Sequence, residues 1–278
     1  HLKDEGKEYR TLKLYGQEIN LLTSAIARMN MFMHGIEEFD IVRGDTLANP
    51  GLIKNDELKK FNVILANPPY SIKSWDRKSF ESDPFGRNLW GTPPQGCADY
   101  AFQQHIQKSL DVENGRSISL WPHGILFRDA EADMRRKMLE EDLVECVIGL
   151  GPNLFYNSPM EACLLITKTN KEKRKKGEIL IINAIQDVRQ DKNISYLEPN
   201  HIEKIYNAYK AYKDEEGYCK VVSIQDVLSH KASLNMALYV SNVDTSKEKV
   251  SLNEALSTLE TSSRNLVMSM DQLFRELS

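Results

Sequence analysis

The sequence predicts an α/β layered domain with a mainly parallel sheet, followed by a separate C-terminal helix. From Leu12 to Lys168, short apolar runs alternate with amphipathic stretches, which is the pattern of repeated strand–helix units. After Lys168 this rhythm changes, although further strand and helix patterns follow. The last segment, 251–278, carries leucine and methionine at steps of four and three residues, which is typical of a helix that packs on another helix.

Each expected element rests on its spacing of apolar residues and on the residues that end it. Strands are expected at 12–19, 39–45, 61–67, 116–122, 143–150, 161–168 and 177–184, and helices at 21–35, 98–110, 129–141 and 199–217. Gly35 and Gly217 favour helix ends, because glycine readily adopts the left-handed conformation found there. Residues 219–230 look strand-like, and 71–97 are expected to form a long loop rich in Gly, Pro, Ser and Trp.

The composition is that of an ordinary soluble protein, and it excludes several classes. The 278 residues are 41% hydrophobic and 27% charged, and no apolar run approaches the roughly 20 residues of a membrane span. The charged first residues show no signal-peptide pattern, so we expect a cytoplasmic protein without membrane contact. The net charge of −4 argues against a protein that binds nucleic acid alone. If nucleic acid is the substrate, a partner protein or a local basic patch would provide part of the binding.

The cysteines and the one basic run predict ordinary structural roles. The four cysteines are scattered without Cys-x-x-Cys spacing, so we expect no metal site. Cys146 and Cys163 lie in apolar runs, which predicts buried free thiols. The basic run at 168–178 is expected to form a solvated hairpin loop between two strands, with a phosphate contact as the alternative.

The most informative segment is FNVILANPPYS, residues 61–71, in which an apolar strand runs into Asn67, Pro68, Pro69 and Tyr70. Proline lacks the N–H that a sheet needs, so the strand must end there with a stiff backbone. An amino group on a nucleobase is a poor nucleophile, because its lone pair is delocalised into the ring. The Asn67 side-chain oxygen and the Pro68 carbonyl could accept its two N–H groups and turn the lone pair outward, while the base stacks on Tyr70.

This chemistry requires no strong general base, which fits the absence of histidine and carboxylate from the segment. A base inside a duplex would have to be flipped out to reach it. We expect the loop 71–97 to close over the pocket.

Two further strand ends carry acidic residues that suit a nucleoside-bearing cofactor. Ligands of open parallel sheets bind at the carboxyl ends of the strands. Glu18 ends the first expected strand and would hold ribose hydroxyls, and Asp45 ends the next and would accept from an adenine amino group. Either carboxylate alone is more often a helix cap or a surface charge, and an isolated Asn-Pro-Pro-Tyr can be a plain turn. The ordered set of three on successive strands favours the functional interpretation.

These residues resemble a known family, the S-adenosylmethionine-dependent adenine-N6 DNA methyltransferases, and more narrowly the modification (M) subunits of type I restriction–modification systems. The resemblance covers nearly the whole chain. It is carried, in order, by YGQEIN, ARMNMFMHGI, RGDTL, ANPPYS, ADYAFQQHI, LFYNSPMEACLLITK and LSHKASLNMALYV. It implies a Rossmann-like methyltransferase fold with a seven-stranded sheet whose last pair is antiparallel.

The resemblance also implies a set of site residues. Asn67, Pro68, Pro69 and Tyr70 match the catalytic box, and Asn67 also borders the cofactor. Other matching positions are Glu18 for the ribose, Asp45 with Thr46 and Leu47 for the cofactor adenine, and Tyr70, Asp99 and Phe155 for the target base.

The family's glycine-rich first motif, and the central strand that carries it, should precede Leu12 by some twenty residues, yet this sequence lacks both. We therefore expect a truncated chain whose sheet has two unpaired edges, and no measurable methyl transfer from the chain alone.

The expected organisation is a partial catalytic domain at 1–185, an extension of that domain at 186–245, and an assembly helix at 246–278. The implied partners are duplex DNA with a flipped adenine, a specificity (S) subunit bound through the C-terminal helix, a second M subunit and a restriction (R) subunit. Two alternatives remain open. The same chemistry could act on protein glutamine or on ribosomal RNA, or the chain could be a non-catalytic assembly module whose pocket is vestigial. For the C-terminal helix, the alternative to a partner helix is that its seam packs on its own domain.

Overall fold

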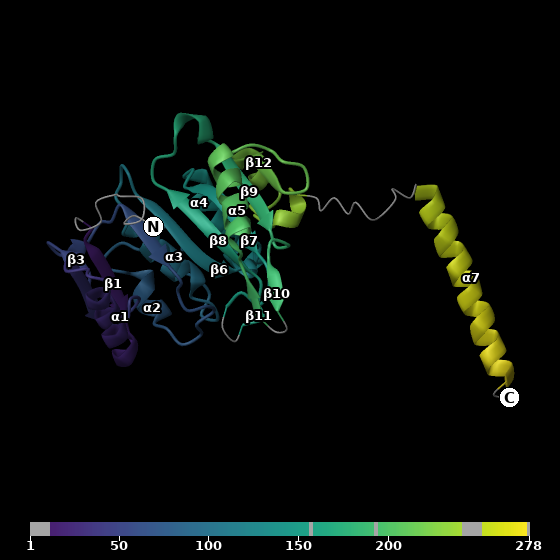
Figure 1. Cartoon of the computed structure of the whole chain (residues 1–278), viewed down its shortest axis with the longest axis horizontal. Coiled ribbons are helices and arrows are strands. Elements are labelled where there is room, and N and C mark those ends of the chain that lie inside the picture. The colour runs from purple at the N-terminus through teal and green to yellow at the C-terminus, as the bar shows by residue number, and fades with distance from the viewer. Residues whose placement is uncertain (1–11, 156–157, 192–193, 241–251, 277–278) are drawn as a thin grey trace. The chain divides into compact units, whose positions relative to one another are not determined.

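The computed structural model describes residues 12–155, 158–191, 194–240 and 252–276. The chain divides into two compact units, His1–Ser241 and Asn242–Ser278 (Figure 1). In the described residues, no helix is both long and apolar enough to cross a membrane.

The first unit is built on a six-stranded sheet with the order β12-β9-β7-β8-β6-β5. Its strands, in that order, are Cys219–Ser223, Glu178–Ala184, Val144–Leu150, Ala162–Lys168, Arg116–Pro122 and Val63–Ala66. β5 pairs with β6 and β7 pairs with β9 in parallel, whereas β8 runs antiparallel to both β6 and β7, and β12 runs antiparallel to β9. Four of the strands therefore point in one direction, and their carboxyl ends meet at a single edge.

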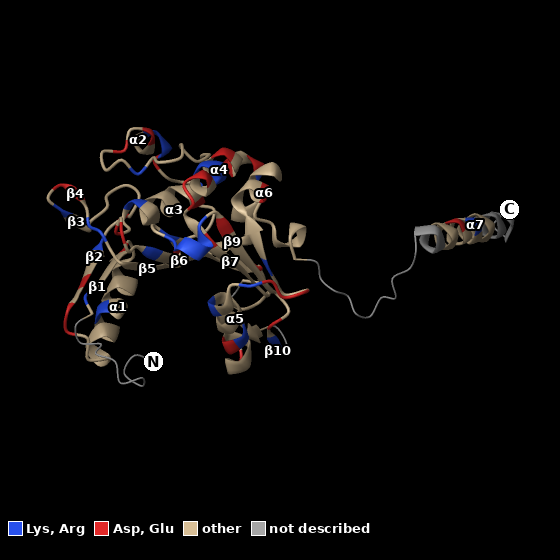
Figure 2. Ribbon diagram, turned by 90° about the horizontal axis from the view of Figure 1, so that it is seen from above, with Lys and Arg blue, Asp and Glu red and all other residues tan. Residues whose placement is uncertain are grey.

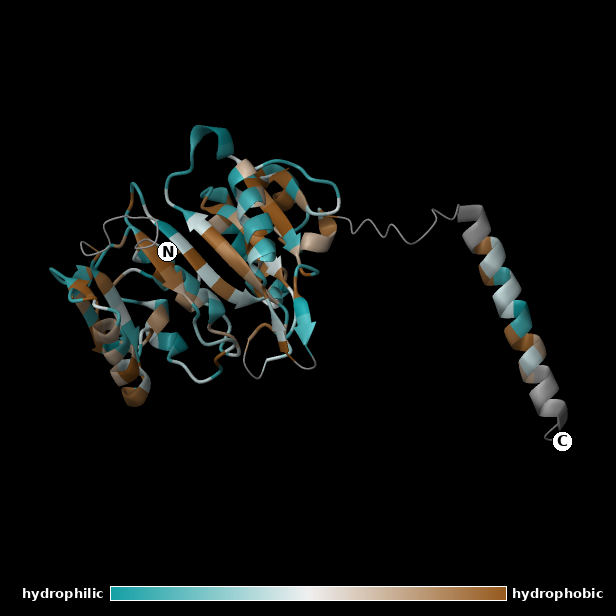
Figure 3. Ribbon diagram, viewed as in Figure 1, coloured by the Kyte–Doolittle hydropathy of each residue, from teal (hydrophilic) through white to brown (hydrophobic). Residues whose placement is uncertain are grey.

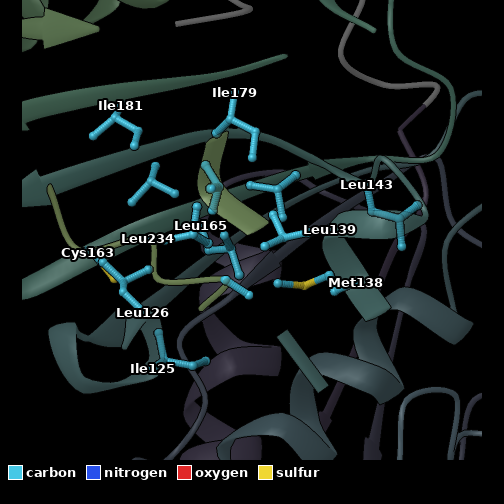
Figure 4. Packing of buried hydrophobic residues seen from close by; sticks show 14 of the residues in the cluster. Ile125, Leu126, Met138, Leu139, Leu143, Cys163, Leu165, Ile179, Ile181 and Leu234 are labelled. Carbon is cyan, nitrogen blue, oxygen red and sulfur yellow. The ribbon is translucent and has the colours of Figure 1, made fainter. Parts of the chain in front are cut away.

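Helices cover both faces of this sheet (Figure 2). On one face lie α3 (Asp99–Lys108), α4 (Ala132–Glu140) and α6 (Ile224–Ser229), and on the other lies α5 (Pro199–Ala211). Alternate residues of the strands feed the two cores, because successive side chains of a strand point to opposite faces. Cys163 and Leu165 of β8, for example, belong to the same cluster as Met138 and Leu139 of α4 (Figure 4). Ile166 belongs to the cluster on the α5 face.

Polar residues of β6 are also buried, and each is paired. The Ser119 hydroxyl and the Trp121 indole N–H both donate to the Gln103 side-chain oxygen, at 2.9 and 3.1 Å. The Ser117 and Thr167 hydroxyls lie 2.7 Å apart. These bonds satisfy polar groups that would be costly to bury alone, and they fix α3 on the sheet.

The N-terminal segments form a second, smaller sheet. β1 (Leu14–Glu18) and β2 (Phe39–Arg43) pair in parallel as a two-stranded sheet, joined by α1 (Leu21–Met33). The Asn20 side chain caps α1 by accepting from the Thr23 N–H at 3.0 Å.

Two short hairpins complete the strands of the described part of the chain. They are β3 (Ile53–Lys54) with β4 (Glu57–Leu58), and β10 (Arg189–Asp191) with β11 (Ile194–Tyr196).

Among the described residues, β1 pairs only with β2, and β5 pairs only with β6. Within the described residues, β1 and β5 therefore each leave one strand edge unpaired. Val63 and Leu65 of β5 are 60% and 74% exposed. α1 also exposes a row of large apolar side chains (Figure 3), among them Leu22, Ile26, Met29, Phe32 and Met33. This region therefore exposes several large apolar side chains.

Several predicted elements end earlier than expected. The helix predicted at 199–217 ends at Ala211, because Tyr212 adopts a left-handed conformation and its side chain is buried. The strand-like pattern at 219–230 is a strand only to Ser223, where the Ser223 hydroxyl caps the short helix α6 by accepting from the Asp226 N–H at 3.1 Å. Both differences arise from local capping that overrides the apolar spacing.

The basic run at 168–178 is not a hairpin, because β7 lies between β8 and β9 in the sheet. Two of its lysines are buried in ion pairs, Lys171 with Asp142 at 2.6 Å and Lys175 with Glu145 at 3.3 Å. Part of the run is therefore structural rather than solvated. Cys146 and Cys163 are buried free thiols, as predicted, and burial raises the pKa of each.

The second unit contains α7, Leu252–Glu276, a helix of 25 residues. Where its side chains are described, its large apolar residues are exposed, including Leu256, Leu259, Leu266 and Met270. These four residues lie on one seam, at steps of three, seven and four.

Candidate active site

The Asn-Pro-Pro-Tyr segment lies at the edge where the parallel strands end. Asn67 directly follows β5, and the short helix that opens at His123 directly follows β6. The loop that carries Phe155 follows β7, and Ala162 opens the antiparallel β8 beside β6. The sheet order therefore brings segments far apart in the sequence to one edge, as expected for an α/β site.

The two predicted acceptors are accessible at this edge. Asn67 is exposed and Pro68 is half-buried. The Tyr70 hydroxyl donates to the Asn67 side-chain oxygen at 2.6 Å. In the described part of the chain, no N–H or O–H donor reaches the Pro68 carbonyl. The segment thus presents one carbonyl without a partner and one amide oxygen held by an aromatic hydroxyl, rather than the closed contacts of a plain turn.

Tyr70 is anchored at the junction of the two cores. It is partly buried against both apolar clusters of the sheet, one on each face, and Phe155 is partly buried against the second of them. Burial, reinforced by the nearby Cys163 and Asp99, raises the pKa of Tyr70, so its hydroxyl stays protonated and can donate. The structure therefore brings two of the predicted target-base residues to the same cluster.

The predicted cofactor carboxylates both use one oxygen to fold the local backbone. Glu18 accepts from the Asn20 N–H at 2.7 Å. Asp45 is exposed and accepts with one oxygen from the Leu47 and Ala48 N–H groups, at 2.8 and 3.1 Å. In the described residues, no donor reaches the second oxygen of either carboxylate. Each carboxylate is thus held in place while one acceptor remains available.

The loop 71–97 packs against the segment that follows Asp45. Its short helix α2 (Arg77–Glu81) and Trp75 bring aromatic rings against Leu47, and Phe80 is buried there. Between them lies a cavity of about 110 Å³ whose lining includes Asp45, Leu47, Trp75, Phe80, Phe85 and Arg87. The Asn-Pro-Pro-Tyr residues do not line this cavity. The loop therefore forms one wall of a space beside the predicted adenine-facing residues.

Arg87 holds this wall in place. Its guanidinium donates to the Thr46 and Leu47 carbonyls, each at 2.8 Å, and forms an ion pair with Asp83 at 2.6 Å. Both side chains of the pair are at most 3% exposed. Burial opposes ionisation of Asp83, but the hydrogen bonds from Arg87 outweigh it, so the pKa of Asp83 is lowered. One buried arginine thus joins the loop to the residues after β2.

His105 on α3 lies behind Arg87, its Nδ1 3.5 Å from the guanidinium. Burial and then the charge of Arg87 lower the pKa of His105 to about 3, whereas an unfolded chain has a histidine pKa of about 6.5. Between these two pKa values, His105 is therefore protonated in the unfolded state and neutral in the folded state. Stability should fall as the pH drops below 6.5, by about 2 kcal/mol between pH 7 and pH 5. Denaturant unfolding at both pH values tests this.

The matched control is His105→Gln, which removes the titrating group and keeps a polar side chain. Its loss of stability on acidification should be smaller than that of the wild type by the same amount. Equal pH dependence of the two proteins would contradict a neutral, partly buried His105.

Asp99 is fully buried at the start of α3, and both of its oxygens are engaged. One accepts from the Ser71 N–H at 2.7 Å and the other from Arg128 at 2.6 Å. Arg128 also pairs with the buried Glu131 at 2.7 Å. The thiol of Cys97 lies close enough to the two carboxylates for the three to resemble metal ligands. The guanidinium of Arg128 already supplies the positive charge there.

Sequence reasoning did not find Arg87, Arg128 or Glu131. Arg87 lies in a loop without periodic pattern, and Arg128 with Glu131 reads as an ordinary surface pair three residues apart. The Arg-Asp-Ala-Glu segment follows a strand end, which is the one sequence signal that could have pointed to the site.

Comparison with known proteins gives the family to which the chain belongs. The model of the N-6 DNA Methylase family matches residues 1–248. The Type I restriction enzyme MjaVIII methylase subunit of Methanocaldococcus jannaschii is 34% identical over 258 residues, covering 88% of this chain and 44% of that protein. The HindI methylase subunit of Haemophilus influenzae is 31% identical, covering 89% of this chain and 56% of that protein. The chain thus spans about half the length of these relatives.

A solved structure gives the same result. The methyltransferase subunit of a type I restriction–modification system from Streptococcus thermophilus superimposes with a TM-score of 0.77 at 33% identity, covering 84% of this chain and 49% of that one. The fold is therefore the Rossmann-like fold of S-adenosylmethionine-dependent methyltransferases, as the sequence predicted. With the family model matching most of its length, the chain belongs to the N-6 DNA methylase family.

Proposed function

We propose that this chain is the part of a type I modification subunit that transfers a methyl group to N6 of adenine in duplex DNA. The observation that carries the proposal is the pair of acceptors at the tip of β5. The Asn67 amide is exposed and its oxygen accepts from the Tyr70 hydroxyl, and no described donor reaches the Pro68 carbonyl. A stiff backbone with two accessible acceptors suits an amino group that has two N–H donors and no other strong partner.

The chain's own residues would act on a flipped adenine in three ways. Asn67 and the Pro68 carbonyl would accept the two N–H groups of the base and turn its lone pair outward. Tyr70 would support the face of the base, a contact worth about 1–3 kcal/mol for similar stacking. Its hydroxyl now bonds Asn67, so it would give up part of that bond when the amino group arrives. The amine proton leaves after transfer, so no strong base is needed at the start.

The residues present fit S-adenosylmethionine. Glu18 and Asp45 each keep one carboxylate oxygen that no described donor reaches, and these would hold ribose hydroxyls and an adenine amino group. Leu47 and the aromatic wall of the loop line the adjacent cavity and would contact the adenine faces, with Thr46 beside them. When bound, the cofactor would supply an electrophilic methyl group on sulfur. Phe155 is proposed to border the target base, whereas Asp99, whose two oxygens are engaged by Ser71 and Arg128, is proposed to support the segment from behind.

The proposal is tested with the full-length subunit assembled with its specificity subunit and a duplex that carries a two-part site. Methyl-labelled S-adenosylmethionine should give N6-methyladenine after digestion of the DNA. The chain of 278 residues alone should give none. Label in protein glutamine or in RNA, with none in DNA, would overturn the proposal and favour one of the other acceptors of this chemistry.

We also propose that α7 binds the specificity subunit, and that a second modification subunit and a restriction subunit complete the assembly in the cytoplasm. The exposed seam of Leu256, Leu259, Leu266 and Met270 supports the first point, because such a stripe is stable only when another helix covers it. The free thiols in the first unit suit a reducing compartment.

Leu259→Asp combined with Leu266→Asp should abolish co-purification with the specificity subunit, because two charges would be buried in the helix contact. The thermal unfolding of residues 12–240 should not change. The control is Thr261→Asp with Arg264→Asp, which places two aspartates on the same helix away from the seam. Retained binding by the leucine variant would show that the seam has another role.

A further inference from the structure

Arg128 lies between two carboxylates that are both fully buried. Its Nη2 donates to Asp99 at 2.6 Å and its Nε donates to Glu131 at 2.7 Å, while its own side chain is 29% exposed. We call these three residues the Arg128 clamp. Two buried acids this close would repel each other and would be strongly destabilised without the guanidinium. The planar fork of arginine can serve both at once, which an ammonium group cannot.

The clamp is itself held from behind. Arg135 of α4 is 1% exposed, and its guanidinium donates to the Arg128 carbonyl at 3.2 Å and to the Ala232 carbonyl at 2.6 Å. The backbone of Arg128 is therefore tied to the core under α4. Because both its backbone and its guanidinium are held, Arg128 can fix the positions of Asp99 and Glu131 relative to the core.

The other end of the clamp holds the segment proposed to react. Asp99 accepts from the Ser71 N–H at 2.7 Å, directly after Tyr70. Ser71 has a φ of +52°, which a residue with a side chain adopts only when its surroundings enforce it. The next residue is also tied, because the Ile72 carbonyl accepts from the Ala98 N–H at 3.2 Å. The chain thus leaves the Asn-Pro-Pro-Tyr segment through a bend that a buried carboxylate secures.

We propose that the Arg128 clamp positions the Asn67–Tyr70 segment through Ser71, so that Arg128 and Glu131 are positioning residues for methyl transfer although neither touches the base. The inference rests on the proposed function and deepens it. It also reassigns the main role of Asp99, because both oxygens of this residue are engaged by the protein rather than available to a target base.

The test compares Arg128→Met and Arg128→Lys with Lys171→Met in the full-length methyltransferase complex. The Lys171 side chain is 1% exposed and pairs at 2.6 Å with Asp142, which is 31% exposed, so its loss removes a partly buried ion pair far from the segment in sequence. In Arg128→Met, kcat should fall about 100-fold, the effect of a displacement near 1 Å, with KM for S-adenosylmethionine little changed. The kcat of Arg128→Lys should lie between those of Arg128→Met and the wild type. Lys171→Met should lose stability but keep kcat within about twofold of the wild type.

Hydrogen exchange supplies a readout that does not depend on activity. The peptide spanning 67–75 should exchange faster in Arg128→Met than in the wild type, and Lys171→Met should leave it unchanged. If Arg128→Met does not fold, Arg128→Lys decides the same comparisons.

Unchanged exchange at 67–75, or a kcat equal to that of Lys171→Met, would overturn the clamp. Absence of adenine methylation by the wild-type complex would instead refute the proposed function, and the exchange comparison would still decide whether the clamp holds the segment.

Discussion

Asn67→Ala should reduce the rate of adenine methylation about 100- to 1000-fold, the range observed when one preorganised hydrogen-bonding group at a reacting centre is lost. The side-chain oxygen is the acceptor that the protein can lose without a change in the backbone, since the other acceptor is the Pro68 carbonyl. Binding of S-adenosylmethionine and of duplex DNA should change far less, because the free oxygens of Glu18 and Asp45 and the aromatic wall of the cavity remain. Single-turnover kinetics with the assembled complex would separate the chemical step from binding.

The control for this experiment is Asn62→Ala. Asn62 is also exposed, and it lies at the opposite end of β5 from Asn67. The same chemical change there should leave the single-turnover rate within about twofold of the wild type, as is usual for surface positions. A similar loss of single-turnover rate in both variants would mean that Asn67 stabilises the strand and has no direct role in methyl transfer.

Asp83→Asn should destabilise the first unit by about 3–5 kcal/mol, the typical cost of removing one partner of a buried ion pair. Arg87 would keep its bonds to the Thr46 and Leu47 carbonyls but would be buried without a counter-charge. The loop wall and the residues after β2 should therefore loosen together. Denaturant unfolding gives the free energy of unfolding. Trp75 fluorescence reports on the packing of the loop wall, because the ring centroids of Trp75 and Phe80 lie 5.7 Å apart.

Glu81→Gln is the matched control within the same loop. Arg77 and Glu81 also form an ion pair four residues apart at 2.6 Å, but their side chains are 38% and 50% exposed. Solvent screens such a pair, so its loss should cost less than about 1 kcal/mol. Equal effects of the two substitutions would show that burial of the Asp83–Arg87 pair does not determine its contribution.

The regular elements were predictable where their apolar spacing was strong. The strands at 116–122, 143–150, 161–168 and 177–184 agree with the structure to within one residue, because each feeds two cores at once. The ends of helices were less predictable. Tyr212 stops α5 through a left-handed backbone and a buried ring, neither of which composition reveals. The order of strands also lies outside local pattern, which is why the 168–178 segment looked like a hairpin.

The candidate site divides in the same way. Asn67, Pro68 and Tyr70 interrupt a strand with unusual chemistry, so the sequence marks them directly. Arg87 and Arg128 do not stand out, because their importance comes from carboxylates and carbonyls that folding brings to them. Asp99 was found, but its engagement with Ser71 and Arg128 was not, since those contacts join residues 28 and 29 positions apart.

In the part of the chain that the structure describes, β1 and β5 have unpaired edges, and these also determine how the isolated chain behaves when concentrated. A free edge offers a row of N–H and C=O groups to any other strand, and no lysine or proline within Val63–Ala66 discourages such pairing. Exposed Val63 and Leu65 add an apolar face to that template. Crowding the chain therefore favours strand-to-strand self-association and aggregation driven by backbone bonding and apolar burial, which added salt would not disperse.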